Sequence, residues 1–573
     1  MSKKNLPIKI IMQRNSDITP NIANGGCKFF GEVNRELQDS VIAKLESIND
    51  YYEDLFCESS SVPAIIKIKM KKEAIAKSHK PDRFCNNMPI IGSGDLDEIF
   101  CMATRESITN TIQEINILPA KKFNANLTAI EDITPYYNEE KISESLKTIT
   151  NEEFKKIENS IRIELFKLDD EYKNEILKRY VNKKLDELGL GKQSKNIVYG
   201  DKINYIKVKL NSYNQIREIA QINGIRKIDY FCTYNSDSEQ YIDQESKFIV
   251  PEGLHETDVI IGIIDSGISD CNPYLKDYIY DREKYVGDEY INPTHGTFVA
   301  STIQFSDFLN DIDSGNNKLF KFLDVIAIPN GDPIYGKTDS IGEDELMEII
   351  DEVVSKHCHN VKIWNLSLGI EAQICNGSIS NLGAFSDYIQ EKYNVQFFIS
   401  SGNKNIGDLR CWPSQFDEDD DCDRIIAPAD SVRAITVGSI ALKDSEDSVV
   451  NAYEPSPFSR RGPGANYIVK PDLIDFGGNC NSEKDCRGIG IKGLDPNGNV
   501  SELIGTSFST PRIVKKYASI MDEINDPDIL LAKAMLIHSA KVNYGTLKNP
   551  NDIRYYGFGM PHNNINDMIM CSE

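Results

Sequence analysis

Four polar side chains in this chain have the types and surroundings that acyl transfer requires. They are Ser507 in GTSFSTP (505–511), His295 in THGTFVAS (294–301), Asp265 in IIDSG (263–267) and Asn403 in FFISSGN (397–403). A serine hydroxyl becomes a nucleophile when an imidazole takes its proton, and a carboxylate can hold that imidazole in the required tautomer. A side-chain amide can donate to the oxyanion that develops during attack. The four residues therefore predict a nucleophile, a base, an orienting carboxylate and an oxyanion donor.

Each of these residues also has a structural explanation when taken alone. Ser507 precedes a helical pattern of apolar residues, and serine oxygens commonly satisfy the unpaired N–H groups at a helix start. Asp265 follows an apolar strand, where aspartate often begins a turn, and Gly402-Asn403 is also common in turns. The catalytic interpretation rests on all four occurring together, each at the predicted end of a strand or start of a helix.

The remaining histidines have no comparable surroundings. His357 and His359, in SKHCHN, end a predicted helix, where positive charge suits the helix dipole. Residues one or two apart on a helix point in different directions, so we do not expect these two histidines to form a metal site.

The elements that would position the four residues form a repeating pattern from about residue 255. Continuous apolar runs, typical of buried parallel strands, occur at 257–265, 320–329, 361–369, 395–403 and 433–441. Helical patterns lie between several of them, for example at 344–357. Strands alternating with helices predict an α/β fold with a parallel sheet sandwiched by helices, in which ligands bind beyond the carboxyl ends of the strands.

The motifs IIGIIDSGI, THGTFVAS, NLSLG, FFISSGN and GTSFSTP resemble the successive motifs of the subtilisin-like serine peptidases, the subtilases, over roughly residues 255–565. FSRRGPG, KPDLIDFGG and YYGFGMP resemble later segments of the same family. The resemblance implies that Asp265 orients His295, that His295 is the base, and that Ser507 is the nucleophile. It implies Asn403 and the N–H of Ser507 as oxyanion donors. It also implies that the substrate cleft is lined by Leu366, Ser367, Leu368, Gly369, Ser400, Ser401 and Gly402.

The chain departs from the family pattern at three places. Ser509 stands where the family usually has alanine, a change that the helix should tolerate. Asp475-Phe476-Gly477 replaces the usual continuation of the proline-aspartate segment and could alter the wall of the cleft. The acidic segment 411–424 is unusual, and we interpret it as a solvated loop, with a calcium loop as the alternative. We expect no other cofactor.

The amino-terminal half predicts smaller units. We expect an α+β domain over 1–119 with a strand at 64–71, a linker at 120–147, and a further unit at 148–245 before a peptidase domain at 255–573. The unit at 148–245 would contain a long amphipathic helix from Ile157 to Tyr180, closed by Gly189, and a strand–helix–strand layout from 204 to 231. That small α+β layout is similar to subtilase propeptides, which dock on the enzyme and inhibit it.

Composition and charge exclude several classes of protein. A formal charge of −24 argues against nucleic-acid binding, and no apolar run is long enough to cross a bilayer. The start shows no secretory signal and the 13 cysteines form no CxxC pair, so we expect a cytoplasmic protein with reduced thiols. A small loop closed by Cys480 and Cys486 is the alternative for an oxidising compartment.

Two functions remain open at this point. The first is a cytoplasmic serine endopeptidase that cleaves protein or peptide substrates and is regulated by its amino-terminal region. Segments 74–81 and 90–100 also resemble bacterial subtilases that are paired with AAA-type ATPases in phage defence. The second is a binding or scaffold protein with a subtilase fold and little turnover. A fluorophosphonate probe, which labels an activated serine, separates the two.

Overall fold

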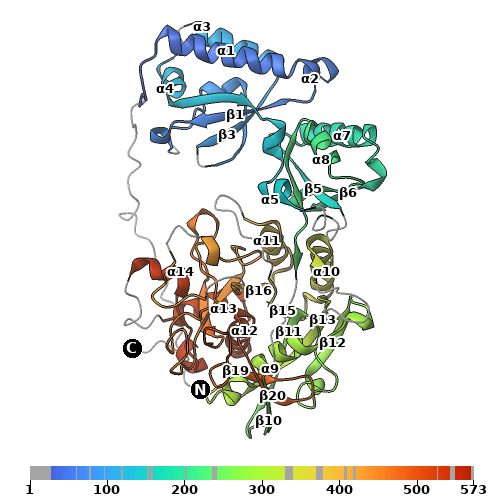
Figure 1. Cartoon of the computed structure of the whole chain (residues 1–573), viewed down its shortest axis with the longest axis vertical. Helices are drawn as coiled ribbons and strands as arrows, with labels where there is room; N and C mark the ends of the chain where they lie inside the picture. Colours follow the sequence, from blue (N-terminus) through green and yellow to red (C-terminus); the bar gives the residue numbers. More distant parts are fainter. Residues whose placement is uncertain are drawn as a thin grey trace. The chain divides into compact units, whose positions relative to one another are not determined.

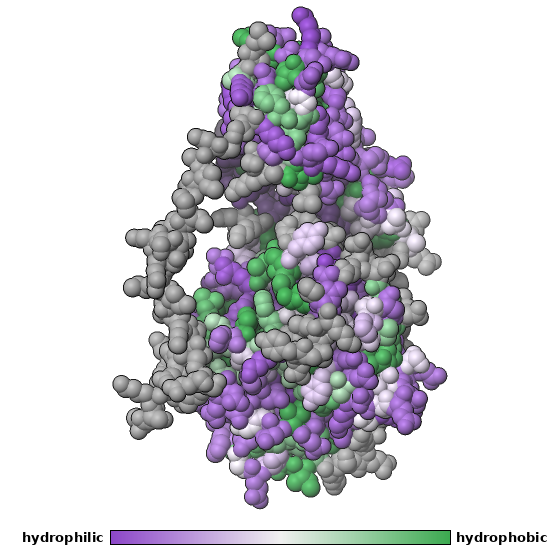
Figure 2. All heavy atoms as spheres, turned by 90° about the vertical axis from the view of Figure 1, so that its left-hand side faces the viewer, coloured by the Kyte–Doolittle hydropathy of each residue, from purple (hydrophilic) through white to green (hydrophobic). Residues whose placement is uncertain are grey.

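The computed structural model forms two compact units, residues 12–231 and residues 232–573. It describes residues 28–573 except for 60, 76–78, 96, 118–119, 151–153, 155–158, 201–202, 235–241, 330–339, 370–378, 405–408, 417–420, 525–526, 542–548 and 570–573. No described helix is both long enough and apolar enough to span a membrane. Hydrophilic side chains cover much of the face shown in Figure 2, in keeping with the high content of charged residues.

The second unit is built on a seven-stranded parallel sheet. Its strands are β11 (His255–Asp265), β12 (Ile279–Lys284), β13 (Lys318–Ile326), β15 (Val361–Leu366), β16 (Gln396–Ser400), β17 (Ile435–Ile440) and β18 (Leu473–Phe476). They lie in the order β12-β13-β11-β15-β16-β17-β18, and each neighbouring pair is parallel. This arrangement confirms the predicted α/β fold and brings the carboxyl ends of the strands to one edge of the sheet.

Helices cover this sheet (Figure 1). They are α9 (Thr294–Leu309), α10 (Glu343–His357), α11 (Asn381–Tyr393), α12 (Thr506–Glu523), α13 (Ile529–Ser539), α14 (Ile553–Tyr556) and α15 (Ile565–Ile569). The central helix is α12, which contacts β11, β15, β16, β17 and β18 and also packs against α9 and α13. Almost every residue of α12 is buried, so this helix is part of the core.

Two small antiparallel sheets complete the second unit. One has the order β10-β20-β19, formed by β10 (Ile242–Lys247), β20 (Asn499–Leu503) and β19 (Ile491–Leu494). The other pairs β9 (Thr233–Tyr234) with β14 (Ile341–Gly342). Strand β20 leads directly into α12, so β10 is hydrogen-bonded to the segment that precedes Ser507.

The first unit contains two four-stranded antiparallel sheets with the same pattern of strand order. The first is β2-β3-β1-β4, formed by β1 (Ala64–Met70), β2 (Ile90–Ser93), β3 (Glu98–Ala103) and β4 (Ile130–Pro135). The second is β6-β7-β5-β8, formed by β5 (Ser160–Leu165), β6 (Ser194–Tyr199), β7 (Ile203–Lys209) and β8 (Ile225–Tyr230). With α7 (Glu171–Glu187) after β5 and α8 (Gln215–Ala220) after β7, the second sheet has the ferredoxin-like βαββαβ order.

The other α-helices in the described part of the first unit are α1 (Arg35–Tyr51), α2 (Glu53–Glu58), α3 (Arg105–Asn116), α4 (Lys121–Ala129) and α5 (Glu144–Thr148). One continuous apolar cluster joins the two sheets and their helices. The predicted strand at 64–71 is present as β1, and the predicted strand–helix–strand layout from 204 to 231 is present as β7, α8 and β8.

The stretch 120–147 is not the linker that its polar sequence predicts. It contains α4 and β4, and β4 pairs with β1 at the edge of the first sheet. The apolar side chains of Phe123, Leu127 and Ile133 are buried in the core of this unit. This polar stretch is nevertheless a folded part of the first unit, because its apolar side chains pack into one core.

The prediction of one long helix from Ile157 to Tyr180 is also wrong. The structure divides this stretch into strand β5 and helix α7, and the side chain of Asp170 caps α7 by accepting from the N–H groups of Tyr172 and Lys173. Ile161 and Ile163 alternate as strand residues and are fully buried, and Gly189 follows the end of α7 as predicted. The apolar residues at spacings of three and four, which predicted one helix, continue across the boundary between β5 and α7.

Candidate active site

Asp265 and His295 form a close pair at the carboxyl edge of the parallel sheet. The two carboxylate oxygens of Asp265 lie 2.8 and 2.9 Å from Nδ1 of His295, and both side chains are buried. Asp265 is the last residue of β11, and its backbone carbonyl accepts hydrogen bonds from Ala327 and Ile328 beyond β13. The sheet therefore fixes the carboxylate, and the carboxylate fixes the imidazole with Nε2 as the nitrogen that can act as a base.

Glycine permits the close approach that makes this pair possible. Gly296 follows His295 in the first turn of α9, and a Cβ on it would lie 2.4 Å from the carbonyl oxygen of Gly267. The turn after Asp265 is also joined to α9 by hydrogen bonds from Gly296 N to Ser266 Oγ and from Ser269 N to Thr297 Oγ1. Any larger residue at 296 would push the histidine helix away from the aspartate.

Ser507 is the second residue of α12 and lies beside the histidine helix. The ring of Phe508, which follows it, lies 5.7 Å from the ring of His295 and 4.6 Å from that of Phe298, centroid to centroid. Pro511 lies inside α12 and has no N–H to donate to the carbonyl of Ser507 four residues earlier. The hydroxyl of Ser367 donates to that carbonyl instead, at 3.1 Å. The backbone carbonyl of Ser507 is therefore bound by a residue that follows strand β15.

Asn403 is attached to the start of the same helix. Its Oδ1 accepts hydrogen bonds from the backbone N–H of Thr506 at 2.9 Å and from the Thr506 hydroxyl at 3.0 Å. Because Oδ1 takes both of these bonds, the amide is oriented with Nδ2 as its donor group. The structure therefore brings Asp265, His295, Asn403 and Ser507 to one edge of the sheet, although they are spread over more than 240 residues of sequence.

Comparison with known proteins agrees with this architecture. The family model described as the subtilase family of peptidases matches residues 256–559, more than half of the chain. The chain belongs to the subtilase family. Its match to y4bN, an uncharacterized protein of Sinorhizobium fredii, is 30% identical over 212 residues and covers 32% of this subtilase and 48% of y4bN. This subtilase thus spans about half the length of that relative.

Solved structures of proteases are also similar to this subtilase. EpiP, the epidermin leader peptide processing serine protease of Staphylococcus aureus, is 16% identical and has a TM-score of 0.43, with 71% of this chain and 97% of EpiP covered. The prenylagaramide maturation protease PagA is 19% identical and has a TM-score of 0.37, with 55% of this chain and 93% of PagA covered.

The residues expected to line the cleft follow two neighbouring strands of the subtilase sheet. Leu366, Ser367, Leu368 and Gly369 end or follow β15, and Ser400, Ser401 and Gly402 end or follow β16. The two segments touch, because the hydroxyl of Ser400 donates to the carbonyl of Leu368 at 3.3 Å. Among them, Ser367 contacts helix α12 directly, because its hydroxyl donates to the Ser507 carbonyl.

The sequence interpretation missed a network of buried charges on the inner side of α12. Arg512 pairs with Asp475 of β18 at 2.7 Å and with Asp307 of α9 at 3.0 Å. Lys516 pairs with Asp475 at 2.6 Å, and Lys515 pairs with Asp307 at 3.2 Å. Burial raises the pKa of Asp475, but the charges of Lys516 and Arg512 outweigh it and hold that pKa below its usual value. This network ties the serine helix to the histidine helix and to the sheet.

Asp475 does not form a wall of the cleft, in contrast to the expectation from its departure from the family pattern. Its side chain is completely buried and turned towards α12. The signal in the sequence is an aspartate inside the apolar strand LIDF, since a charged residue in a buried strand needs a partner. Ser509, the other departure in this region, donates to the carbonyl of Thr506 within α12, as a tolerated small residue should.

A second missed group lies beside Asp265. Asp324 is on β13, and its Oδ2 accepts from Ile268 N at 3.1 Å and from Arg282 Nε at 2.7 Å. Arg282 also donates to the Ile268 carbonyl and to Asp270, so it closes the turn that follows Asp265. Burial raises the pKa of Asp324 to about 6 against the influence of Arg282, and the negative charge of Asp265 raises it further.

The acidic segment 411–424, for which the sequence predicts a solvated loop or a calcium loop, includes one deeply buried carboxylate. Residues 417–420 lie outside the described residues. Asp423 is fully buried and pairs with Arg410 at 3.2 Å and with Arg461 at 2.7 Å. Two guanidinium groups already balance this carboxylate, so Asp423 does not fit a calcium ligand.

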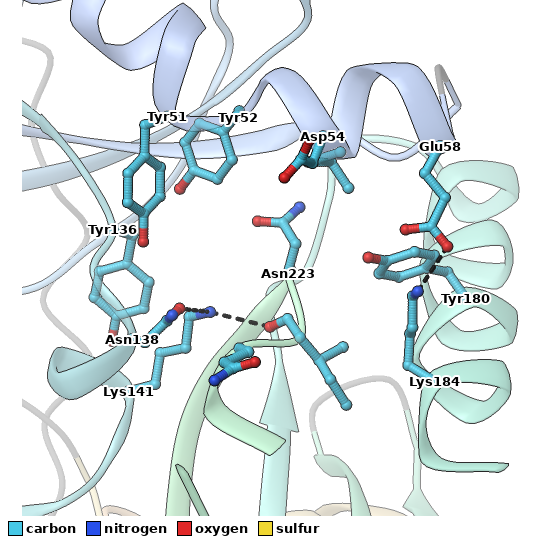
Figure 3. A pocket seen from close by; sticks show the side chains of 13 residues that line it. Tyr51, Tyr52, Asp54, Glu58, Tyr136, Asn138, Lys141, Tyr180, Lys184 and Asn223 are labelled. Carbon is cyan, nitrogen blue, oxygen red and sulfur yellow. Dashed lines mark hydrogen bonds and ion pairs between the residues drawn. The ribbon is translucent and has the colours of Figure 1, made fainter. Parts of the chain in front are cut away.

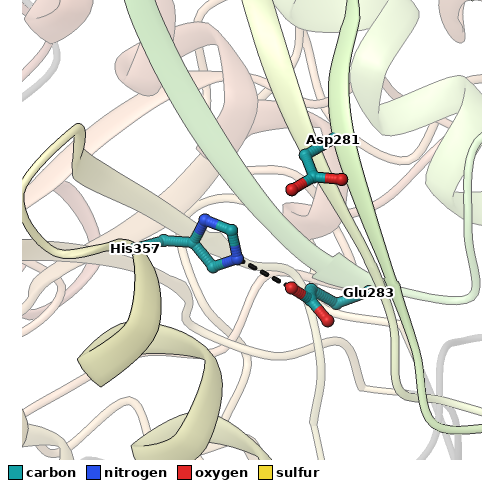
Figure 4. A group of neighbouring side chains, drawn as sticks. All are labelled: Asp281, Glu283 and His357. Carbon is teal, nitrogen blue, oxygen red and sulfur yellow. Dashed lines mark hydrogen bonds and ion pairs between the residues drawn. The ribbon is translucent and has the colours of Figure 1, made fainter.

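Only one group of side chains in the described ranges has the spacing of a metal site, and it includes His357 (Figure 4). The ligand atoms of Asp281, Glu283 and His357 lie within 4.8 Å of one another. Nε2 of His357 lies 2.8 Å from Glu283 Oε1, and the ammonium of Lys356 is 2.5 Å from the same oxygen. Lys356 and His357 at the end of α10 already bind Glu283, and His359 is not part of the group.

The first unit contains a pocket of about 320 Å³ (Figure 3). It is lined by Tyr51, Tyr52, Asp54, Leu55, Glu58, Tyr136, Asn138, Lys141, Tyr180, Lys184, Gln221, Ile222 and Asn223. Both lysines of the pocket have partners: Lys184 pairs with Glu58 and Glu187, and Lys141 donates to Asn138 and to the carbonyls of Ala220 and Ile222. Burial lowers the pKa of Lys141 to about 7. These described lining residues include no nucleophile with an adjacent base.

The side chains of Cys480 and Cys486 are buried, and no disulfide joins them. The two side chains belong to a small apolar cluster with Phe458. Their role in the described structure is packing.

Proposed function

We propose that this subtilase is a serine endopeptidase that hydrolyses peptide bonds through Asp265, His295 and Ser507, with Asn403 as an oxyanion donor. The observation that carries the proposal is the paired contact of Asp265 with Nδ1 of His295, next to the helix start where Asn403 binds Thr506. Four groups with complementary chemistry meet at the edge of a parallel sheet where ligands bind.

The reaction follows from these positions. The hydroxyl of Ser507 attacks the substrate carbonyl and transfers its proton to Nε2 of His295, which later gives it to the leaving amine. Asp265 stays ionised and balances the imidazolium. Nδ2 of Asn403 and the N–H of Ser507 donate to the oxyanion, because N–H groups at a helix start have no partner within the helix. Water then releases the acyl group by the same route.

We further propose that the first unit restrains this activity. Support comes from its ferredoxin-like second sheet, which has the layout of subtilase propeptides, and from β10, which pairs with the strand before the nucleophile. A tethered inhibitor acts at an effective concentration of about millimolar. With a specific cleavage site inserted in the stretch 235–241, cutting and dilution should raise peptide turnover. Turnover that stays constant on dilution would contradict restraint.

A cytoplasmic location and a pairing with an AAA-type ATPase in phage defence are further proposals. They are supported by the sequence alone: the 13 cysteines form no CxxC pair, and segments 74–81 and 90–100 resemble such subtilases. Co-purification of an ATPase from the native host with the Ser507→Ala chain, and not with an unrelated acidic protein, would support the pairing.

Labelling with a fluorophosphonate tests the catalytic assignment. The parent chain should be labelled and should cleave an unstructured protein substrate, whereas Ser507→Ala should do neither. Ser509→Ala, on the same helix, is the matched control and should be labelled. If the folded chain resists the probe both before and after cutting at the site inserted in the stretch 235–241, the alternative function, a scaffold with a subtilase fold, is correct.

A further inference from the structure

The slot between the two cleft segments is filled by the side chain of Ile426. Gly369 follows β15 and Gly402 follows β16, and a Cβ on these residues would lie 2.9 and 2.6 Å, respectively, from side-chain carbons of Ile426. The two glycines have no side chains, so the isoleucine occupies the space between them. Ile426 is only 5% exposed.

This slot lies next to the reacting groups. Gly402 is followed by Asn403, which binds Thr506, and Ser367, two residues before Gly369, binds the carbonyl of Ser507. A substrate carbonyl that sits between the Ser507 hydroxyl and Asn403 places the side chain of its own residue beside these two segments. The slot is therefore where the residue before the scissile bond must fit.

Ile426 is held in place by its surroundings. Its carbonyl accepts from Ala429 N at 2.8 Å, and the neighbouring Ile425 donates to the carbonyl of Arg461 at 2.8 Å. Arg460 links the same region to the oxyanion side, since it donates to the carbonyls of both Asn403 and Arg424. The backbone around Ile426 is therefore hydrogen-bonded on both sides, and this fixes the position of its side chain in the slot between Gly369 and Gly402.

We infer that Ile426 is a specificity-determining residue that limits the residue before the scissile bond to glycine or alanine. This inference rests on the proposed peptidase function and names its substrate class: peptides with a very small residue at the position whose carbonyl is attacked. A leucine or phenylalanine there would have to displace a packed isoleucine. Each excess carbon in such a pocket lowers kcat/KM by about 10- to 200-fold.

The test uses the full chain and peptides that differ only in the residue before the scissile bond, which is glycine, alanine, leucine or phenylalanine. The parent should cleave after glycine or alanine at least about 100-fold more efficiently than after phenylalanine, measured as kcat/KM. Ile426→Ala should raise kcat/KM for leucine and phenylalanine by about 10-fold or more relative to glycine. Ile426→Val should shift the preference in the same direction by a smaller factor, and it keeps the test valid if the alanine variant does not fold.

Ile425→Ala is the matched control, because Ile425 is also fully buried and adjacent in the chain. It should leave the ratio of kcat/KM values unchanged. A parent that cleaves after phenylalanine as well as after glycine overturns the inference, as does an unchanged ratio in both folded Ile426 variants. If the chain takes up no fluorophosphonate either before or after a cut in the stretch 235–241, the proposed function itself fails, and that outcome is distinct from a labelled enzyme with a different preference.

Discussion

The two sides of helix α12 use charged and polar residues in opposite ways. At its start, Ser507, Asn403, His295 and Asp265 lie at the sheet edge, where Asp265 contacts His295 and Asn403 accepts from Thr506. Along its inner side, Arg512 and Lys516 are permanently paired with carboxylates from β18 and α9. We therefore expect substitutions at the start of α12 to lower activity, and substitutions along its inner side to lower the free energy of unfolding.

The largest expected effect is at the nucleophile. Ser507→Ala should lower turnover by about six orders of magnitude, as loss of the nucleophile does in this family, while the unfolding midpoint in urea stays close to that of the parent. Turnover of a peptide and urea unfolding are measured on the same preparation. A variant that unfolds much earlier than the parent would show that the two sides of α12 are not separable.

The opposite result is expected on the inner side of α12. Asp475→Asn leaves Arg512 and Lys516 as buried cations with one partner fewer, so the free energy of unfolding should fall by about 3–5 kcal/mol. Asp485→Asn is the control, because Asp485 pairs with Arg487 at the surface and should have little effect. Equal unfolding midpoints for the parent and Asp475→Asn would contradict the role given to the network.

Asn403 has two roles in this proposal: its amide donates to the oxyanion, and its oxygen accepts from Thr506 at the start of α12. Asn403→Ala should lower kcat by about 10²- to 10³-fold with little change in KM, because the oxyanion donor acts mainly in the transition state. Asn403→Asp keeps an oxygen acceptor for Thr506 but loses the amide donor, so it separates the two roles. If Asn403→Asp restored most of the kcat lost in the alanine variant, the oxyanion role would be wrong.

The smallest expected effect is a pH dependence at Asp324. Its pKa is raised to about 6 in the folded protein, from an ordinary value of 3.8, because burial disfavours the charged form. The protonated form therefore favours folding below pH 3.8, and this contribution is lost as pH rises through 6, at a cost of up to about 3 kcal/mol. Asp324→Asn cannot titrate, so its stability relative to the parent should increase between about pH 4.5 and 7.5 in urea unfolding.

The control for this prediction is Asp270→Asn, which removes the exposed partner of Arg282 and leaves Asp324 in place. Its stability should change with pH as that of the parent does. Parallel pH dependences for the parent and Asp324→Asn would show that the carboxyl does not titrate in this range.

The parts of the structure that the sequence could predict are those with a local pattern. Continuous apolar runs and motifs next to glycine indicated the parallel sheet and the positions of Asp265, His295 and Ser507, because these depend on short stretches of chain. The ion pairs of Arg512 could not be predicted, since cations on a helix usually face solvent and their partners come from β18 and α9. In the first unit, spacing alone did not separate β5 from α7, because Ile161 and Leu165, four residues apart, fit both the strand period and the helix period.

The pairing of β10 with β20 has a mechanical consequence. Ile242, at the end of β10 nearest to the first unit along the chain, is opposite Glu502, only five residues before Ser507. Tension on β10 would therefore reach the segment before Ser507 through one hydrogen-bonded ladder, although 265 residues of covalent chain separate Ile242 from Ser507. Tension along this short route acts on the strand that leads into α12, so the second unit has a short load path from β10 to the serine proposed as the nucleophile.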